Sequence, residues 1–335
     1  MSEKMRAVVY EQPETISLQS CGIPEPESGW AIVKVHYCGI CGTDLNIYGG
    51  GHPRAKGPLV LGHEFAGEIV SHPELTAGAP VTARPILSCG TCSSCLDGIP
   101  HVCENLRLVG IDRAGGMAEY VSVPADEVFQ LPASLSIKQG ALIEPYAVAV
   151  HAVRKSKFKP GDQCLVFGAG PIGLCTAYTL RHMGVRNLVI VEVHPFRREL
   201  AEQLGFAVLH PQDKDFLSLL NDHFKGGHAD VVFDCAAHPS VASILPEVTK
   251  VNGQIVLVGT YKQPAPLDLQ SITFKEISIT GTRVYTKRDY EIALDLMVNN
   301  EGFDNIITHE FSLQDAQKGF DALKSGNAVK VLITM

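Results

Sequence analysis

The sequence predicts an α/β protein that combines a β-rich domain with a doubly wound parallel sheet. A chain of 335 residues is longer than one compact core of usual size, so two domains are expected. Roughly the first 135 residues carry short β-branched segments separated by glycine and proline. From about residue 140, apolar strands alternate with helical segments, which is typical of a parallel sheet covered on both faces.

The elements follow in chain order. In the β-rich part, β-branched and aromatic residues recur with partial alternation, which predicts strands at 6–10, 31–37, 66–70 and 117–123. An apolar helix is expected at 141–155, and a turn at 159–163 then opens the alternating series. Its strands are expected at 163–167, 187–193, 229–236 and 253–260, with a helix at 196–205 and a closing strand at 329–335.

Composition excludes several classes of function. Apolar residues make up 45% and charged residues 19%, and the formal charge of −8 argues against a nucleic-acid surface. The start of the chain has no signal-peptide pattern, and no apolar run approaches the roughly 20 residues of a membrane helix. Ten cysteines without an export signal indicate a reducing compartment, so a cytoplasmic protein is expected, with neither membrane nor nucleic acid as partner.

The most specific motif is a group of four cysteines with the spacing C-x2-C-x2-C-x7-C. Four thiolates so spaced can close a tetrahedral zinc site, which predicts a structural zinc. Disulfides or reduced core thiols are the alternative interpretation. The four residues are Cys89, Cys92, Cys95 and Cys103.

A glycine-rich turn of the form G-x-G-x-x-G lies between a predicted strand and a predicted helix. Its glycines permit a tight turn and close approach of backbone N–H groups to a pyrophosphate, so it predicts a dinucleotide site; the alternative is a turn that only packs a helix on the sheet. The residues expected to contact the cofactor are Gly168, Gly170, Pro171, Ile172 and Gly173.

An acidic residue, Glu192, stands nineteen positions after the last of these glycines. A carboxylate there bonds ribose hydroxyls and repels a 2′-phosphate, which favours NAD over NADP. Arg197 and Arg198 follow closely and are able to hold a phosphate instead, so NADP stays open.

Cys38, Cys41, His63 and Glu64 form a second group of metal-binding residue types. A catalytic zinc takes three protein ligands and keeps one open position. The peptidase signature H-E-x-x-H is absent, because Gly67 stands where its second histidine belongs. The spacing alone also fits an ordinary packed or solvated histidine.

Together, CGICGTD, GHE, the four cysteines, EP at 144–145 and GAGPIG resemble the zinc-containing medium-chain dehydrogenase/reductase superfamily, nearly end to end. The similarity is nearest to its sorbitol/polyol, threonine/butanediol and sugar-acid branch. It implies a GroES-like catalytic domain over 1–147 and 283–335, and a Rossmann domain over 148–282. Two zinc ions per chain and a nicotinamide cofactor are expected, and relatives suggest a homo-tetramer or homo-dimer.

The resemblance also implies roles for particular residues. Cys41 and His63 match the ligands of the catalytic zinc, whereas Cys38 is expected to pack. Glu64 matches a glutamate that either ligates the zinc or lies just behind it, and Glu144 matches the third ligand or water-holding carboxylate of the polyol branch. Thr43 matches the hydroxyl that receives the substrate proton.

Two further positions bear on the residue roles that the resemblance implies. Asp44 is expected to orient His63 from behind. Asn46 replaces a histidine that ends the proton relay in many relatives, which leaves the exit route of the proton open.

The function expected is zinc-dependent hydride transfer from a secondary hydroxyl of a polyol, sugar acid or similar small polar alcohol to NAD(P). Threonine, vicinal-diol and simple alcohol dehydrogenases are the enzymatic alternatives. A non-enzymatic cofactor-binding protein on the same scaffold is the alternative of another class, and loss of the catalytic ligands would indicate it. Every expected ligand is present in this chain.

Overall fold

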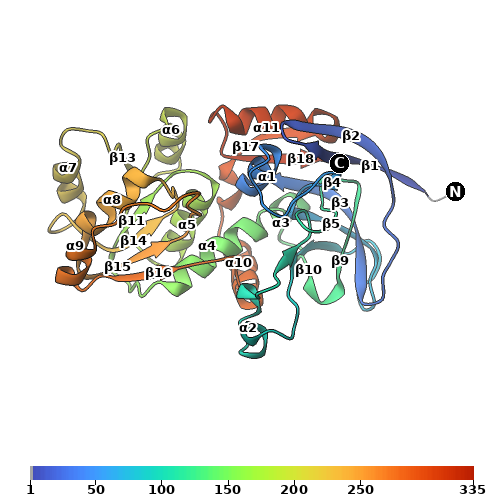
Figure 1. The fold of residues 1–335 in the computed structure, drawn as a ribbon, viewed down its shortest axis with the longest axis horizontal. Coiled ribbons are helices and arrows are strands. Elements are labelled where there is room, and N and C mark those ends of the chain that lie inside the picture. The colour runs from blue at the N-terminus through green and yellow to red at the C-terminus, as the bar shows by residue number, and fades with distance from the viewer. Residues whose placement is uncertain (1–2) are drawn as a thin grey trace. The chain divides into compact units, whose positions relative to one another are not determined.

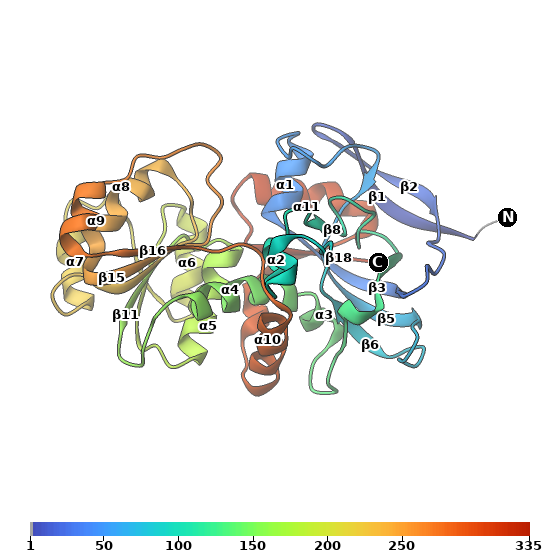
Figure 2. The same cartoon turned by 60° about the horizontal axis from the view of Figure 1, so that its bottom comes forward.

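Residues 3–335 are described by a computed structural model of the chain. Contacts divide them into two compact units, drawn in Figures 1 and 2. Unit 1 comprises the residues up to Glu144 together with Thr286–Met335, and unit 2 is Pro145–Tyr285. Segments from both ends of the chain therefore build unit 1.

Unit 1 is built on a seven-stranded sheet in the order β10-β6-β5-β3-β18-β17, with β9 also paired to β3. The long central strand β3 pairs antiparallel with β5, β9 and β18, so the C-terminal strand enters the same sheet as the N-terminal ones. The strands are β3 (Trp30–Ile40), β5 (Glu64–Ser71), β6 (Pro80–Ala83), β9 (Tyr120–Pro124), β10 (Val128–Gln130), β17 (Ile307–Ser312) and β18 (Lys330–Thr334).

Two smaller sheets and several helices complete unit 1. A three-stranded sheet has the order β2-β1-β4, and the two-stranded β7-β8 sheet flanks the segment of four cysteines. The strands are β1 (Lys4–Gln12), β2 (Thr15–Gly22), β4 (Leu59–Val60), β7 (Ile86–Leu87) and β8 (Arg107–Leu108). The helices are α1 (Gly42–Tyr48), α2 (Ser93–Leu96), α3 (Ile137–Gly140), α10 (Lys287–Asn299) and α11 (Ala316–Lys324), and α4 (Ile143–Lys155) runs from Glu144 into unit 2.

Unit 2 is a six-stranded parallel sheet in the order β13-β12-β11-β14-β15-β16. Buried side chains such as Leu165, Phe167, Val232 and Ile255 form its core. The strands are β11 (Gln163–Phe167), β12 (Asn187–Val191), β13 (Ala207–Leu209), β14 (Ala229–Asp234), β15 (Thr249–Leu257) and β16 (Ser278–Gly281). The helices are α5 (Pro171–His182), α6 (Pro195–Gln203), α7 (Phe216–His223), α8 (Pro239–Val248) and α9 (Leu269–Lys275). The predicted fold class is confirmed.

The strand order reverses between β11 and β14. Chain order runs outward from β11 through β12 to β13 on one side, and from β14 through β15 to β16 on the other. In open parallel sheets, ligands bind outside the carboxyl ends of the strands at such a switch point. The carboxyl ends of β11 and β14 are therefore the expected place for a ligand of unit 2.

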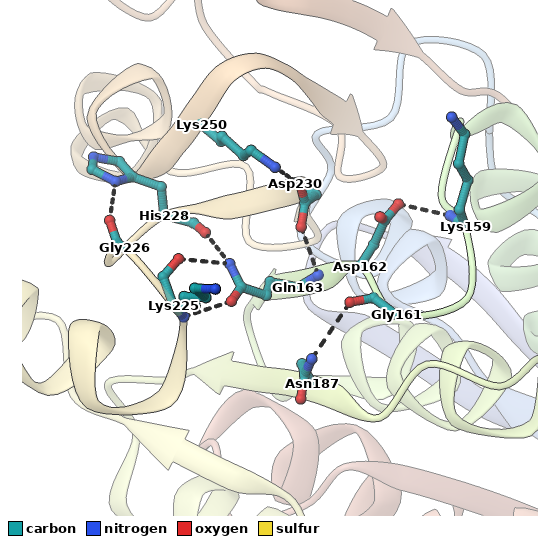
Figure 3. A network of polar contacts seen from close by, with 10 residues as sticks. All are labelled: Lys159, Gly161, Asp162, Gln163, Asn187, Lys225, Gly226, His228, Asp230 and Lys250. Atoms are coloured by element: carbon teal, nitrogen blue, oxygen red, sulfur yellow. Dashed lines mark hydrogen bonds and ion pairs between the residues drawn. The ribbon is translucent and has the colours of Figure 1, made fainter.

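At the opposite, amino-terminal edge of this sheet, a polar network joins the starts of β11, β14 and β15 (Figure 3). Gln163 receives a hydrogen bond from the Lys225 backbone N–H at 2.5 Å and donates to the carbonyl of His228 at 2.8 Å. Asp230 accepts from the Gln163 backbone N–H at 2.9 Å and pairs with the Lys250 ammonium at 2.5 Å. The starts of these strands are thus linked by the protein's own polar groups.

Among residues 3–335, no helix is both long and apolar enough to cross a bilayer.

The network predicts a pH-dependent contribution to stability from Asp230. Partial burial raises its pKa, but the Gln163 N–H and the Lys250 ammonium outweigh that effect and hold the pKa below its ordinary value. A lowered pKa stabilises the fold above the unfolded-state value of about 3.9, and the contribution disappears as the pH falls through the folded-state pKa. Asp230→Asn should therefore lower the melting temperature at pH 7, and the deficit should shrink on titration towards about pH 3.

Asp222→Asn is the matched control, because Asp222 lies exposed on α7 of the same unit. It should leave the melting temperature unchanged. A deficit in Asp230→Asn that stays constant with pH would contradict the electrostatic explanation.

Candidate functional site

Unit 1 gathers Cys41, His63 and Glu64 so closely that one ligand atom of each lies within 4.8 Å of the others. Cys41 follows the end of β3 and caps the N-terminus of α1. His63 immediately precedes β5, whose first residue is Glu64. The approach depends on Gly62, which has φ +94° and where a Cβ would lie 2.9 Å from the Met117 backbone nitrogen. A thiolate, an imidazole and a carboxylate so grouped suit zinc.

Asp44 lies behind His63, with 3.7 Å between its Oδ1 and the histidine Nδ1. It is fully buried and accepts hydrogen bonds from the backbone N–H groups of Cys41 at 2.8 Å and Gly62 at 3.3 Å. Burial alone lowers the pKa of His63, but Asp44, Cys41 and Glu144 together raise it well above its ordinary value. Asp44 thus links the backbone of Cys41 to that of Gly62, which precedes His63, and it faces the His63 ring.

Glu64 accepts hydrogen bonds from a residue to which the sequence pattern assigned no role. Lys330 of β18 donates to both carboxylate oxygens of Glu64, at 2.8 and 2.6 Å, and both side chains are 1% exposed. Space for this carboxylate exists only because residue 39 is glycine, since a Cβ there would lie 2.1 Å from Glu64 Oε2. The ammonium compensates a charge that is costly to bury alone.

Cys38 is also buried near this group, but it is not among the clustered ligand atoms. Burial, together with the nearby Asp44 and Glu64 carboxylates, raises the pKa of its thiol well above its ordinary value. A neutral thiol that packs in the core is a poor metal ligand, because the thiolate is the ligating form.

Thr43, Glu144 and Asn46 are the other positions that the sequence associated with the cluster. Thr43 is half-buried in the first turn of α1, and Glu144 is buried in the first turn of α4. The charge of Glu144 acts on His63, which places the two side chains in the same neighbourhood. The side-chain oxygen of Asn46 lies against Gly51, where a Cβ would come within 2.5 Å of it.

The four sulfurs of Cys89, Cys92, Cys95 and Cys103 approach one another. The Sγ–Sγ distances are 3.9 Å for Cys89–Cys95, 3.8 Å for Cys92–Cys103 and 3.5 Å for Cys89–Cys103. Zinc–sulfur bonds of about 2.3 Å imply tetrahedral edges of about 3.8 Å. The arrangement therefore fits a closed zinc site with four sulfur ligands.

The backbone around these cysteines favours thiolates. The N–H groups of Thr91 and Cys92 lower the pKa of Cys89 to about 5. Desolvation and the neighbouring sulfurs, Cys92 foremost among them, instead raise the pKa of Cys95 to about 12. Four adjacent thiolates repel one another, so a cation is needed to hold all of them ionised.

The glycine-rich turn lies at the carboxyl end of β11, at the switch point of unit 2. Gly168 has φ +98°, and a Cβ at Gly173 would lie 1.8 Å from the Gly168 carbonyl oxygen. Gly170 caps α5, Pro171 and Ile172 open it, and the Arg197 guanidinium lies 3.7 Å from the position of a Cβ on Gly170. A glycine turn feeding a helix N-terminus suits a pyrophosphate, and Arg197 adds a positive charge beside it.

Glu192 directly follows β12 and lies buried beside the same turn. Its Oε2 accepts from the Ala169 N–H at 2.7 Å, and its Oε1 accepts from the N–H groups of Val193 and His194, both at 2.8 Å. These bonds fix the carboxylate against the glycine-rich turn, within the region that a dinucleotide ribose occupies in such folds.

The sequence pattern assigned no role to three polar residues that take part in buried or partly buried hydrogen bonds: Lys330, Asp234 and Tyr261. Asp234 ends a strand that the sequence predicts, so its position at the carboxyl edge could have been inferred. Lys330 and Tyr261 carry no local signal, because their partners Glu64 and Asp234 are distant in sequence.

In the comparisons with known proteins, the family models and the relatives named here are all dehydrogenases. The alcohol dehydrogenase GroES-like domain matches residues 27–133, and the zinc-binding dehydrogenase family matches residues 171–299. L-galactonate-5-dehydrogenase of Escherichia coli K12 is 32% identical, over 98% of this chain and 99% of its own length. (R,R)-butanediol dehydrogenase of Bacillus subtilis 168 is 34% identical, with the same coverage. A solved short chain alcohol dehydrogenase of Escherichia coli CFT073, in complex with NADH, has a TM-score of 0.92 and 30% identity over 99% of both chains.

The buried pair predicts a large effect of removing Lys330. Lys330→Met leaves the Glu64 carboxylate buried without its cation, which should lower the free energy of unfolding by about 3–5 kcal/mol. Adding Glu64→Gln should recover part of this loss, because the uncompensated charge is then removed. Urea denaturation followed by circular dichroism measures both.

Lys324→Met is the control, since Lys324 pairs with Glu14 on the surface. It should leave stability unchanged within error. If Lys330→Met behaves like this control, the buried pair does not carry the stability assigned to it.

Proposed function

The chain belongs to the zinc-containing medium-chain dehydrogenase/reductase superfamily, as its sequence motifs predicted, and on that premise we propose the chemistry of its site. It is an oxidoreductase that uses zinc and a nicotinamide cofactor. We propose that it oxidises a secondary hydroxyl of a sugar acid, polyol or similar small polar alcohol. The observation that carries this proposal is the cluster of Cys41, His63 and Glu64 in unit 1.

We propose that Cys41, His63 and a glutamate hold the catalytic zinc. Zinc bound here supplies Lewis acidity towards a substrate hydroxyl. Both oxygens of Glu64 already accept hydrogen bonds from Lys330, which supports Glu144 as the third ligand and Glu64 as a carboxylate behind the metal. Asp44, whose Oδ1 lies 3.7 Å from the His63 Nδ1, would orient this ring when His63 binds the metal.

We propose that Thr43 receives the proton of the substrate hydroxyl, and a bound nicotinamide would accept the hydride from the carbon that bears this hydroxyl. A hydroxyl is able to accept and donate a proton at once, so Thr43 suits a relay. Asn46 does not titrate, so the proton leaves from Thr43 to water or another group rather than through residue 46.

We propose a structural role for a second zinc, at Cys89, Cys92, Cys95 and Cys103. The sulfur distances and the N–H groups directed at them support a closed tetrahedral site. Four sulfur ligands leave no open coordination position, so this site stabilises the loop between β7 and β8.

We propose NAD as the preferred cofactor, bound by Gly168, Gly170, Pro171, Ile172 and Gly173. The fixed Glu192 carboxylate supports this preference, since it would accept hydrogen bonds from ribose hydroxyls and repel a 2′-phosphate. Arg197 beside Gly170 would contact phosphate, and it keeps NADP as the second cofactor to be tested.

We propose that domain limits of 1–147 with 283–335, and of 148–282, separate catalysis from cofactor binding. The contact units, which divide at Glu144/Pro145 and Tyr285/Thr286, support limits close to these. The cysteines of both groups are not joined in disulfides, which supports a reducing compartment, and we propose the cytoplasm.

We propose that the chain forms a homo-dimer or homo-tetramer. β16 is an edge strand, and large apolar side chains are exposed on it and on neighbouring α9, including Phe274 at 77% exposure. Such an edge is a surface that a second copy is able to cover. Sedimentation velocity at micromolar concentration distinguishes a dimer or tetramer from a monomer. A monomer would contradict the proposed assembly.

A substrate panel tests the function. Sugar acids, polyols, 2,3-butanediol, threonine and primary alcohols are assayed with NAD and NADP by nicotinamide absorbance. The sugar acids or polyols should exceed primary alcohols in kcat/KM by at least about tenfold, corresponding to one or two polar contacts made in the transition state. NAD should exceed NADP. A preference for threonine or butanediol would instead select those alternatives, and no turnover in the presence of zinc would contradict the enzymatic assignment.

Metal analysis tests the two zinc sites separately. Cys41→Ser should lose one of two zinc ions and lower kcat by more than about 100-fold with little change in melting temperature. Cys95→Ser should lose the other zinc and lower the melting temperature first.

Cys38→Ser is the matched control for Cys41→Ser, because it makes the same atomic change three residues earlier. It should retain both zinc ions. Two zinc ions and full activity in Cys41→Ser would refute the proposed catalytic site.

A further inference from the structure

Asp234, the last residue of β14, is fully buried and collects hydrogen bonds from two loops. Its Oδ1 accepts from the backbone N–H groups of Ala236 at 3.1 Å and Ala237 at 2.9 Å. Ala237 has φ +48°, in the left-handed region that side chains rarely adopt. The carboxylate thus holds the turn after β14 in a conformation that the backbone disfavours on its own.

The second loop follows β15. Its first residues, Val258 and Gly259, donate backbone N–H groups to the Asp234 carbonyl at 2.9 and 2.8 Å. Further along, the Tyr261 hydroxyl donates to the free carboxylate oxygen, Oδ2, at 2.6 Å. One residue at the end of β14 therefore fixes the starts of both loops.

Tyr261 anchors a segment that is otherwise weakly held. Residues 258–268 contain no helix or strand, and most of their side chains are exposed or half-buried. Burial and the bond to Asp234 raise the pKa of the Tyr261 phenol, so it stays a donor throughout the physiological range. Removing one hydroxyl should loosen this loop without touching the strands beneath it.

The hydrogen-bonded pair of Asp234 and Tyr261 lies at the switch point of the sheet. Gly168, the first glycine of the nucleotide turn, lies against the turn after β14, where its Cβ would be 3.4 Å from the Ala236 nitrogen. In turn, a Cβ on Gly259 would lie 2.8 Å from the Ala237 Cβ. The loops after β11, β14 and β15 thus pack in series along the carboxyl edge, where a bound dinucleotide lies.

We propose that Tyr261 is a positioning residue for the nicotinamide cofactor, acting through its hydrogen bond to Asp234 to hold the loop after β15 in its binding conformation. This inference rests on the proposed cofactor site. Loss of the bond leaves the loop to be ordered by the cofactor itself, so part of the binding free energy is used for ordering. The effect falls on cofactor affinity rather than on hydride transfer.

The test measures NADH and NADPH binding directly, by nicotinamide fluorescence, on the zinc-loaded protein without substrate. Tyr261→Phe removes only the hydroxyl and should raise the Kd of NADH about five- to tenfold, because part of the free energy of this hydrogen bond is then required to order the loop on binding. The value of kcat at saturating NAD should stay within about twofold, because the reacting groups are untouched. The melting temperature without cofactor should fall by no more than about 4 °C, because only one hydrogen bond is lost, and the zinc content should match that of the wild type.

Tyr120→Phe is the matched control, since it removes the same atom from a half-buried tyrosine of unit 1. Asp234→Asn and the double variant complete a cycle. Asp234→Asn should change the Kd less in the Tyr261→Phe background than in the wild type, because only the wild type has the Tyr261–Asp234 bond to lose.

The outcomes separate this inference from the proposed function. An unchanged Kd in Tyr261→Phe overturns the positioning role while leaving the cofactor site intact. A lower melting temperature without cofactor, with no more effect on Kd than Tyr120→Phe, also overturns it and leaves only a structural role. A wild-type protein that binds neither NADH nor NADPH refutes the proposed cofactor function and the inference together.

Discussion

Unit 1 of this protein depends on one buried ion pair. Lys330 lies on the last strand and Glu64 on β5 beside His63, and both are almost fully removed from solvent. A carboxylate so close to the candidate ligands is sustainable only if its charge is compensated. Because β18 pairs with β3, which ends just before Cys41, the C-terminus of the chain completes the surroundings of residues near its start.

Carboxylates held by backbone N–H groups recur at three turns of the structure. Asp44 receives such bonds beside the metal-binding residues, Glu192 beside the glycine-rich turn, and Asp234 at the switch point. Each follows or ends a strand or caps a short helix, where unpaired N–H groups are available. The same arrangement thus fixes loops in both units without requiring a cation at each one.

The two candidate metal groups differ in what surrounds them. The four-cysteine group lies on an exposed loop, and its own sulfurs fill every position around a metal. The group at Cys41 and His63 is set among buried charges, including Asp44, Glu64 and Glu144. Burial lowers the pKa of His63, but Asp44, Cys41 and Glu144 together raise it, whereas the pKa shifts in the four-cysteine group come from backbone N–H groups, desolvation and neighbouring sulfurs.

The sequence by itself determined the family, the α/β class and the parallel sheet, because periodicity and residue spacing act over short distances. It also identified the glycine-rich turn, whose strand and helix are adjacent in the chain. Only the tertiary structure revealed that Lys330 forms a buried ion pair with Glu64 and that the Tyr261 hydroxyl donates a hydrogen bond to Asp234. Strand register decides such pairs: Lys330 and Glu64 are 266 residues apart, and no local pattern records which strand will lie beside which.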